Sequence, residues 1–216
     1  MWLSLLSVAF GAPTHASINA ASWKQISTRT TDGGTVTVYE TSIDGVACFR
    51  GEMVTTVAPQ VLLSVAIDIP TCTRWSTAGV RDSEVLAKGA DWVEYYQYLD
   101  VPGWTMASDR FWFLRLTAVS SPERSTVQWD RMGERGGPHN LKFDAVLAAN
   151  SSAVEPSLNI GGWTFAKTPA GTRVDYRVCT NPGGSIPVVV QNAATKQTLP
   201  ETVADVVREA KRRSAP

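Results

Sequence analysis

The feature that most constrains the fold is a long series of strand patterns that changes, once, to helical spacing near the C-terminus. Short segments rich in β-branched and aromatic residues, separated by turn residues, follow one another over residues 35–179. After them, apolar residues recur at helical spacing: Leu199, Val203, Val206, Val207 and Ala210. This order predicts an α+β fold in which a curved antiparallel β-sheet grips a long C-terminal helix, with an apolar cavity between the two.

The individual elements follow from their turn and cap residues. A helix is expected to begin at Pro59, because proline suits the first helical turn. Residues 133–140 are rich in glycine and are expected to form a loop. The expected strands are residues 35–41, 46–55, 80–88, 92–99, 110–119, 125–131, 162–167 and 172–179.

The C-terminal helix is predicted to form in two segments, residues 186–194 and 199–213. Thr198 and Glu201 have the spacing of a capping box, which marks the start of a helix. Pro200 lacks the backbone N–H that a continuous helix would use. We therefore expect the helix to kink or break just before this proline.

The first residues have the character of a secretory signal peptide. Residues 2–12 are apolar apart from two serines and a glycine, and this stretch is too short to span a bilayer. Thr14 and Ala16 have the small side chains of a cleavage site, although no Lys or Arg precedes the apolar stretch. We predict a signal peptide over residues 1–16, a mature domain over residues 17–216, and export to the periplasm or the medium. The alternative is a cytoplasmic protein whose apolar N-terminus docks on the domain.

The composition excludes several classes of protein. Lys and Arg number 20 and Asp and Glu number 20, so the net charge is zero and no basic face for nucleic acid is expected. Hydrophobic residues make up 44% and charged residues 19%, which is typical of a folded domain rather than a disordered chain. With two histidines and three widely spaced cysteines, the chain offers no metal-binding pattern. We predict a monomer with no metal, cofactor or nucleic-acid partner.

No sequence motif of an enzyme is present. The chain lacks a nucleophile elbow, a zinc-protease motif and a phosphate-binding P-loop. His139 lies in the glycine-rich loop with no partner nearby in the sequence, and we interpret it as a surface histidine. Glu94 is the carboxylate of most interest, because aromatic residues surround it on its strand. On this basis we expect no catalytic activity.

Aromatic residues are concentrated on consecutive strands, and one alternating set is expected to line the cavity. Over residues 92–99, Tyr96 and Tyr98 share one face whereas Tyr95 and Leu99 share the other, and periodicity does not say which face is inward. We choose Tyr96 and Tyr98. The full set of residues predicted to contact a bound molecule is Glu94, Tyr96, Tyr98, Asp109, Arg110, Phe111, Phe113, Trp129, Val203 and Val207.

The segment before the C-terminal helix resembles a motif of a known family. It reads Asn-Pro-Gly-Gly-Ser-Ile-Pro over residues 181–187, and an apolar run ending at Asn192 follows it. With Trp23 at the start and the turn that begins at Asp44, this order resembles START domains, the StAR-related lipid-transfer family. The resemblance covers residues 23–213. It implies a helix-grip fold whose cavity holds a lipid or sterol-like molecule.

One departure from the family pattern lies on the strand of residues 110–119. START domains commonly carry Arg followed by Asp at this point, and the Arg often supplies a buried charge in the cavity. This chain has the reverse order, Asp109 and then Arg110. Because side chains alternate on a strand, the reversal exchanges which charge points inward. The sequence leaves open which of the two residues faces the cavity.

The resemblance implies a carrier that takes a lipid or another hydrophobic molecule into its cavity. Such a carrier would transfer the molecule or present it at a membrane, with transient membrane contact. One alternative is a helix-grip enzyme of the cyclase or hydrolase type, since a fold does not settle a function. A second alternative is a lipid-sensing module without transfer activity.

Two of the three cysteines are expected to pair if the chain is exported. Cys48 lies within an apolar strand, where a buried free cysteine is common. We therefore favour a disulfide between Cys72 and Cys179.

Overall fold

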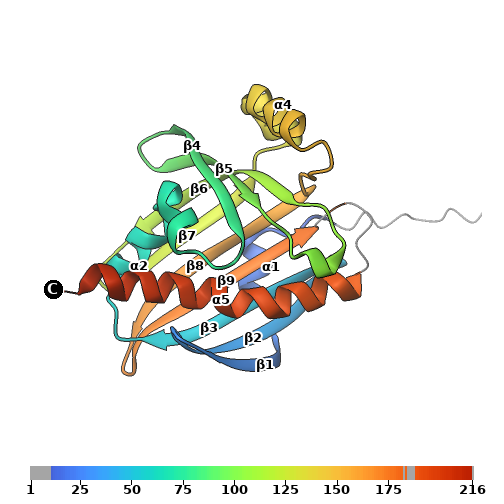
Figure 1. Ribbon diagram of the computed structural model, residues 1–216. Helices are drawn as coiled ribbons and strands as arrows, with labels where there is room; N and C mark the ends of the chain where they lie inside the picture. The colour runs from blue at the N-terminus through green and yellow to red at the C-terminus, as the bar shows by residue number, and fades with distance from the viewer. Residues whose placement is uncertain (1–10, 182, 184–187, 216) are drawn as a thin grey trace, which may run out of the picture.

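The computed structural model describes residues 11–181, 183 and 188–215, and at its centre is one antiparallel sheet of nine strands. The strand order is β1-β2-β3-β9-β8-β7-β6-β5-β4 (Figure 1). The strands are β1 (Lys24–Thr31), β2 (Gly34–Ile43), β3 (Val46–Thr55), β4 (Val80–Lys88), β5 (Trp92–Leu99), β6 (Arg110–Ser120), β7 (Arg124–Arg131), β8 (Leu158–Thr168) and β9 (Gly171–Asn181).

Tight turns join most neighbouring strands, as the sequence predicts. Between β2 and β3, Asp44 and Gly45 both have positive φ angles, 52° and 81°, which is the geometry of a two-residue hairpin. The chain then crosses from β3 to β4 at the far edge of the sheet. The crossing is made by α2 (Pro59–Ala66), the 3-10 turn η1 (Ile69–Thr71) and α3 (Cys72–Trp75). A short 3-10 turn, η2 (Gly103–Thr105), lies between β5 and β6.

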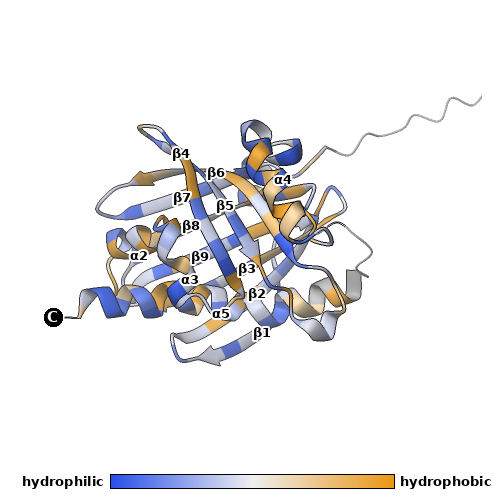
Figure 2. Cartoon of the chain, turned by 45° about the horizontal axis from the view of Figure 1, so that its top comes forward, coloured by the Kyte–Doolittle hydropathy of each residue, from blue (hydrophilic) through white to orange (hydrophobic). Residues whose placement is uncertain are grey.

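The C-terminal helix α5 (Val188–Ser214) lies across one face of the sheet, which we call the inner face (Figure 1). α2 packs beside it. The predicted α+β fold, a curved antiparallel sheet gripping a long C-terminal helix, is confirmed. Figure 2 shows hydrophobic and hydrophilic residues interspersed along most of the strands, as side-chain alternation requires.

The prediction of a break in the terminal helix is wrong. α5 runs for 27 residues with Pro200 inside it. Proline in a helix interior costs about 3 kcal/mol. The apolar residues on the buried side of α5, among them Leu199 and Val203, are at most 3% exposed and join the main core. Their burial outweighs the missing hydrogen bond and keeps the helix continuous.

Two further helices cover the other face of the sheet, which we call the outer face. α1 (His15–Ala20) packs on β8, and α4 (Asn140–Ala149) covers the aromatic residues of β5 and β6. The sequence did not predict α4 or β1. The expected loop at residues 133–140 contains a 3-10 segment, η3 (Glu134–His139), interrupted by three residues with positive φ, Arg135, Gly136 and Gly137.

The predicted cleavage site lies close to the start of the folded part. Thr14 caps α1, so the bond between Ala16 and Ser17 lies inside this helix. Ile18 is buried on the outer face of the sheet. Residues 1–10 lie outside the described part, and the signal peptide stays a prediction. Among the described residues, no helix is long and apolar enough to cross a membrane.

Candidate ligand-binding cavity

A cavity of about 290 Å³ lies between the inner face of the sheet and the helices α2, α3 and α5. Strands β4 to β9 and the three helices all contribute to its walls. The aromatic side chains on its surface are Trp75, Tyr95, Trp112, Trp129, Trp163 and Tyr176. Burial raises the pKa of Tyr95 and of Tyr176 far above the usual value, so both phenols remain neutral. The aromatic part of the cavity wall is therefore neutral, and the cavity is largely apolar.

α5 presents a more polar side to the cavity than the sequence predicts. Its lining residues are Thr195, Thr198, Thr202 and Val206. Val203 and Val207, which the sequence analysis placed beside the ligand, are fully buried in the core and do not line this cavity. The reason is close packing of the helix on the sheet. A Cβ atom at Gly51 of β3 would lie only 2.7 Å from Cγ2 of Val203.

The predicted inward face of β5 and β6 is also wrong. Tyr96, Tyr98, Phe111 and Phe113 point to the outer face, where they form a cluster with Phe143 of α4. The residues between them, Tyr95, Gln97 and Leu99 on β5 and Trp112 and Leu114 on β6, line the cavity instead. Period-two alternation separates the two sets correctly, but only α4, which the sequence did not predict, shows which set is outside.

Tyr96 and Tyr98 border a second, more open hollow of about 500 Å³ between α4 and β4–β5. Its walls include Arg81, Asp82 and Lys142, of which Arg81 and Asp82 are exposed. A hollow open to water and lined by charges removes less apolar surface from solvent than an enclosed one. The inner cavity, which is less open and has a single charged residue in its described wall, is therefore the better site for a hydrophobic molecule.

Glu94 lies on the outer face as well, in an ion-pair cluster. Its carboxylate is 2.7 Å from Nε2 of His139 and accepts hydrogen bonds from Arg115. Burial opposes ionisation of this carboxylate, but the bonds from Arg115 and His139 outweigh burial and lower the pKa of Glu94. The predicted surface histidine thus has a partner that lies 45 residues away in the sequence. Neither residue lines the cavity.

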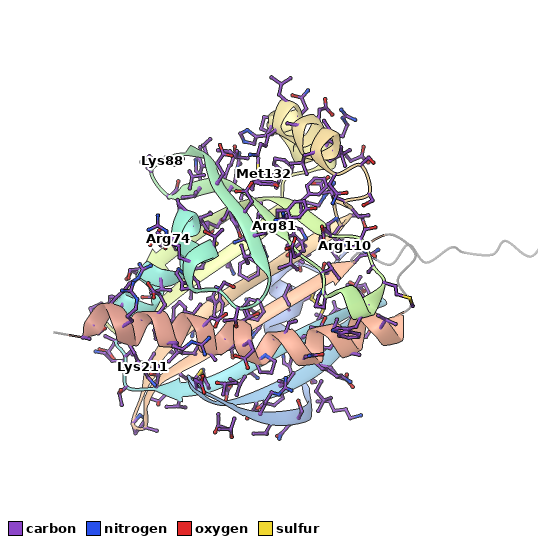
Figure 3. All side chains as sticks on the ribbon, viewed as in Figure 1. Arg74, Arg81, Lys88, Arg110, Met132 and Lys211 are labelled. Carbon is purple, nitrogen blue, oxygen red and sulfur yellow. A yellow bond between two sulfur atoms is a disulfide. The ribbon has the colours of Figure 1, made fainter. Side chains whose placement is uncertain are left out.

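The structure decides the orientation of Asp109 and Arg110. Arg110 shares the strand face of Trp112, and its guanidinium donates to the backbone carbonyls of Ser108 and Gly183 (Figure 3). Burial lowers the pKa of Arg110. Asp109 points the other way and accepts hydrogen bonds from the Tyr98 hydroxyl at 2.8 Å and from the backbone of Val101. Neither charge lies in the cavity wall.

Trp129 is the one predicted site residue that lines the cavity. Its Nε1 donates to Oδ1 of Asn159 at 2.9 Å, so the indole is held in a defined orientation. The sequence analysis missed Tyr95, Trp112 and Asn159. The alternation of side chains on β5 could have identified Tyr95, because Tyr95 belongs to the face opposite Tyr96 and Tyr98, which we did not choose.

Asp68 is the only charged residue among the described residues of the cavity wall. Its carboxylate accepts hydrogen bonds from Arg213 of α5 and from the Thr71 hydroxyl, each at 2.8 Å. A hydrogen bond also fastens α5 nearby, where the Asp205 carboxylate accepts from the backbone N–H of Thr77 at 2.6 Å. Among the described residues no group of three potential metal ligands occurs.

The disulfide differs from the prediction. Cys48 and Cys179 are bonded, and Cys72 is free and buried. β3 and β9 are neighbours in the sheet and place Cys48 directly opposite Cys179, with the Cα atoms 4.2 Å apart. Ile18 of α1 packs in the same cluster on the outer face. The predicted pairing is wrong because the sequence does not show that β3 and β9 are neighbours in the sheet. The two paired cysteines are 131 residues apart.

The segment that resembles the family motif lies mostly outside the described residues. Of residues 181–187, only Asn181 and Gly183 are described. Asn181 ends β9, and its side-chain oxygen accepts from the backbone N–H of Gly183 at 3.3 Å.

The chain matches no protein-family model and no curated protein. Among solved structures it is similar to human STARD10, with a TM-score of 0.71 and 14% identity, covering 94% of this chain and 81% of that chain. A STAR-related lipid transfer protein fragment from Xanthomonas axonopodis is 22% identical, with a TM-score of 0.65, covering 88% of this chain and 98% of that one.

An aromatase/cyclase from Streptomyces, ZhuI, is also similar, with a TM-score of 0.56 and 14% identity. The match covers 78% of this chain and 95% of that chain. Lipid-transfer proteins and an aromatase/cyclase thus share this architecture. The comparisons therefore establish the fold of this chain but not its function. The chain has the helix-grip fold of StAR-related lipid transfer domains.

Proposed function

We propose that this protein binds a hydrophobic molecule of the lipid class in the cavity under α5 and carries or presents it. The observation that carries the proposal is the cavity under α5, whose walls are mostly aromatic and aliphatic and otherwise consist of neutral polar groups and the ion-paired Asp68. Moving apolar ligand surface out of water into such a space contributes about 25 cal/mol per Å² before the costs of binding.

Transient contact with a membrane is part of the proposal. The loop that carries η2 exposes two large apolar side chains, Trp104 at 54% and Met106 at 95%. In Figure 1 this loop lies beside the N-terminal half of α5. An exposed tryptophan and methionine suit a bilayer interface, where the ring or thioether leaves water. With export as predicted, the protein would act as a monomer on lipids outside the cytoplasm.

Catalysis in this cavity has less support. The described cavity wall contains no histidine, and its carboxylate, Asp68, is already ion-paired. The Glu94–His139 pair, which has the chemistry of an acid–base couple, lies on the outer face under the η3 segment. The similarity to an aromatase/cyclase is therefore a similarity of fold, and the enzyme alternative is left as an outcome of the test.

Native mass spectrometry of the purified full-length chain, followed by solvent extraction, tests the proposal. We expect a hydrophobic compound bound in a 1:1 ratio and recovered chemically unchanged. Transfer of a fluorescent lipid analogue between vesicles then separates a carrier from a sensing module. A protein that holds no compound and takes up no lipid analogue would contradict the proposal, and a compound released in altered form would favour the enzyme.

A further inference from the structure

Three polar groups on the cavity wall have no protein partner and are open to the cavity. They are the hydroxyls of Tyr95 on β5 and Tyr176 on β9 and the side-chain amide nitrogen of Asn159 on β8. None of the three forms a hydrogen bond within the described part of the chain. Nε1 of Trp112 is also unpaired there, but it is occluded, whereas these three atoms are not. A molecule in the cavity can therefore reach all three, which we call the cavity donors.

The hydrogen bond from Trp129 fixes the direction of the Asn159 amide. An indole Nε1 can only donate, and here it donates to Oδ1 of Asn159 at 2.9 Å. Nδ2 is therefore the free end of the amide, and its two N–H groups can only donate. Asn159 is 7% exposed and lines the cavity, so a partner for these N–H groups has to enter the cavity.

The cavity donors lie around one part of the cavity. The ring of Tyr176 stacks on Trp129, with 5.7 Å between the ring centres, and the same indole holds Asn159. Tyr95 comes from a more distant strand of the curved sheet, but its phenol is near enough to that of Tyr176 for a charge there to raise the pKa of Tyr95. Burial raises the pKa of both tyrosines far above the usual value, so both keep the proton that a hydroxyl donates.

Neutral donors of this kind favour a ligand group that accepts hydrogen bonds and carries no charge. A carbonyl oxygen accepts two hydrogen bonds and brings no proton that needs a partner of its own. A carboxylate fits less well, because it would be buried without a cation: Arg213 is already paired with Asp68, the charged residue of the described wall. A pure hydrocarbon would cover the cavity donors and leave them unpaired, which costs free energy.

We infer that the cavity selects a hydrophobic molecule with a neutral carbonyl group, as in a ketone or an ester, and that Tyr95, Tyr176 and Asn159 bind its oxygen. The apolar remainder of the molecule lies against the indoles of Trp129 and Trp163, which line the same cavity. This inference rests on the proposed function, since it names the class of molecule that the same cavity takes.

Titration calorimetry with two probes of equal shape tests the role of the oxygen. The probes are 2-acetylnaphthalene and 2-isopropenylnaphthalene, in which a methylene group replaces the carbonyl oxygen. We expect the ketone to bind about tenfold more tightly, because only its oxygen pairs with the cavity donors.

Three variants locate this preference on the cavity donors. Tyr95→Phe and Tyr176→Phe each remove one hydroxyl and keep the ring, and each is expected to lower the affinity for the ketone about fivefold while that for the hydrocarbon stays within about twofold. Asn159→Asp keeps an oxygen for Trp129 but removes the amide donor, and is expected to abolish the preference. Tyr96→Phe is the matched control, because Tyr96 is the next residue on β5 and points to the outer face. Circular dichroism and the melting temperature show that each variant is folded.

Infrared spectroscopy of the bound ketone gives a second measurement that does not depend on affinity. Hydrogen bonding weakens the carbonyl bond, so we expect its stretching band at lower wavenumber in the wild-type complex than in hexane. The band is expected to move back toward the hexane position in Tyr95→Phe and in Tyr176→Phe, and to stay at the wild-type position in Tyr96→Phe.

The outcomes separate this inference from the proposed function. Equal affinity of the wild type for both probes overturns the inference, and so does a carbonyl band that is the same in Tyr95→Phe, Tyr176→Phe and the wild type. Uptake of a fluorescent lipid analogue from vesicles, without binding of either naphthalene, overturns it too but leaves the proposed function intact. Failure to bind the lipid analogue and both naphthalenes defeats both.

Discussion

The two faces of β5 and β6 carry similar aromatic residues but serve opposite purposes. On the outer face, Phe111 and Phe113 are fully buried against Phe143 of α4, and the open hollow beside them lies nearer to β4. On the inner face, Tyr95 and Trp112 border the cavity, because α5 packs on β1, β2 and β3 rather than directly on β5 and β6. The difference shows that an aromatic band by itself indicates burial; whether it becomes core or cavity depends on which helix covers it.

Phe113→Ala tests the filled face and has the largest expected effect. The centre of the Phe113 ring lies 5.5 Å from the centre of the Tyr96 ring. Phe113 also packs against Phe111 and Phe143. Its removal is expected to lower the free energy of unfolding by about 3–5 kcal/mol in urea denaturation. Phe113→Leu is the control and should lose less. The affinity of the folded fraction for a ligand should be unchanged, and a large loss of affinity would show that the two faces are coupled.

Gly33→Ala tests how closely α5 approaches the inner face at the opposite end of the sheet. A Cβ atom at Gly33 would lie 2.8 Å from the backbone oxygen of Ala204 and 2.9 Å from its Cβ. We expect a loss of about 1–3 kcal/mol, because backbone must move to relieve the contact. Gly103→Ala is the matched control, since a Cβ atom there meets nothing within 4 Å. Equal stabilities of the two variants would contradict the close packing of helix and sheet.

Glu94→Gln tests the ionic contact that holds the η3 segment to the outer face. The folded protein lowers the pKa of Glu94 below its ordinary value of 4.5, so the carboxylate adds stability above that pH and loses it as the pH falls further. We expect the variant to be less stable by about 1 kcal/mol at pH 7, since the Arg115 side chain is 52% exposed.

Thermal unfolding at several pH values measures this difference. The gap between wild type and Glu94→Gln is expected to be constant above about pH 5 and to shrink at lower pH. A gap that persists unchanged below pH 4 would mean that the charge of Glu94 contributes nothing. Ligand affinity should not follow this titration, because Glu94 lies outside the cavity.

Leu114→Trp tests the hollow face and has the smallest expected effect on stability. Leu114 lines the cavity, so the indole ring of a tryptophan at this position can extend into the cavity. We expect the free energy of unfolding to change by less than about 1 kcal/mol, whereas ligand affinity falls about tenfold or more. Val119→Trp is the control at a position that is 68% exposed on the same strand. Unchanged affinity in Leu114→Trp would place the ligand elsewhere.

Much of the architecture could be predicted from local patterns in the sequence. Turn residues such as Asp44 and Gly45 and the β-branched runs between them place most of the strands to within a few residues, and the helical stripe that begins at Leu199 gives the final helix. These signals are local, because turn geometry and side-chain periodicity depend on neighbours in the chain. They also suffice to divide the residues of each strand into two faces.

Only the tertiary structure decided which face is the cavity and how distant residues meet. Tyr96 and Tyr95 are equivalent by periodicity, and the choice between them depends on α4 and α5, which reach the sheet from other parts of the chain. The same holds for Cys48 and Cys179, which pair across 131 residues, and for Pro200, which remains in the helix because the buried side of α5 is packed on the sheet. In each case the deciding energy comes from contacts between residues that are far apart in the sequence. Local sequence preferences do not depend on such contacts and therefore cannot predict them.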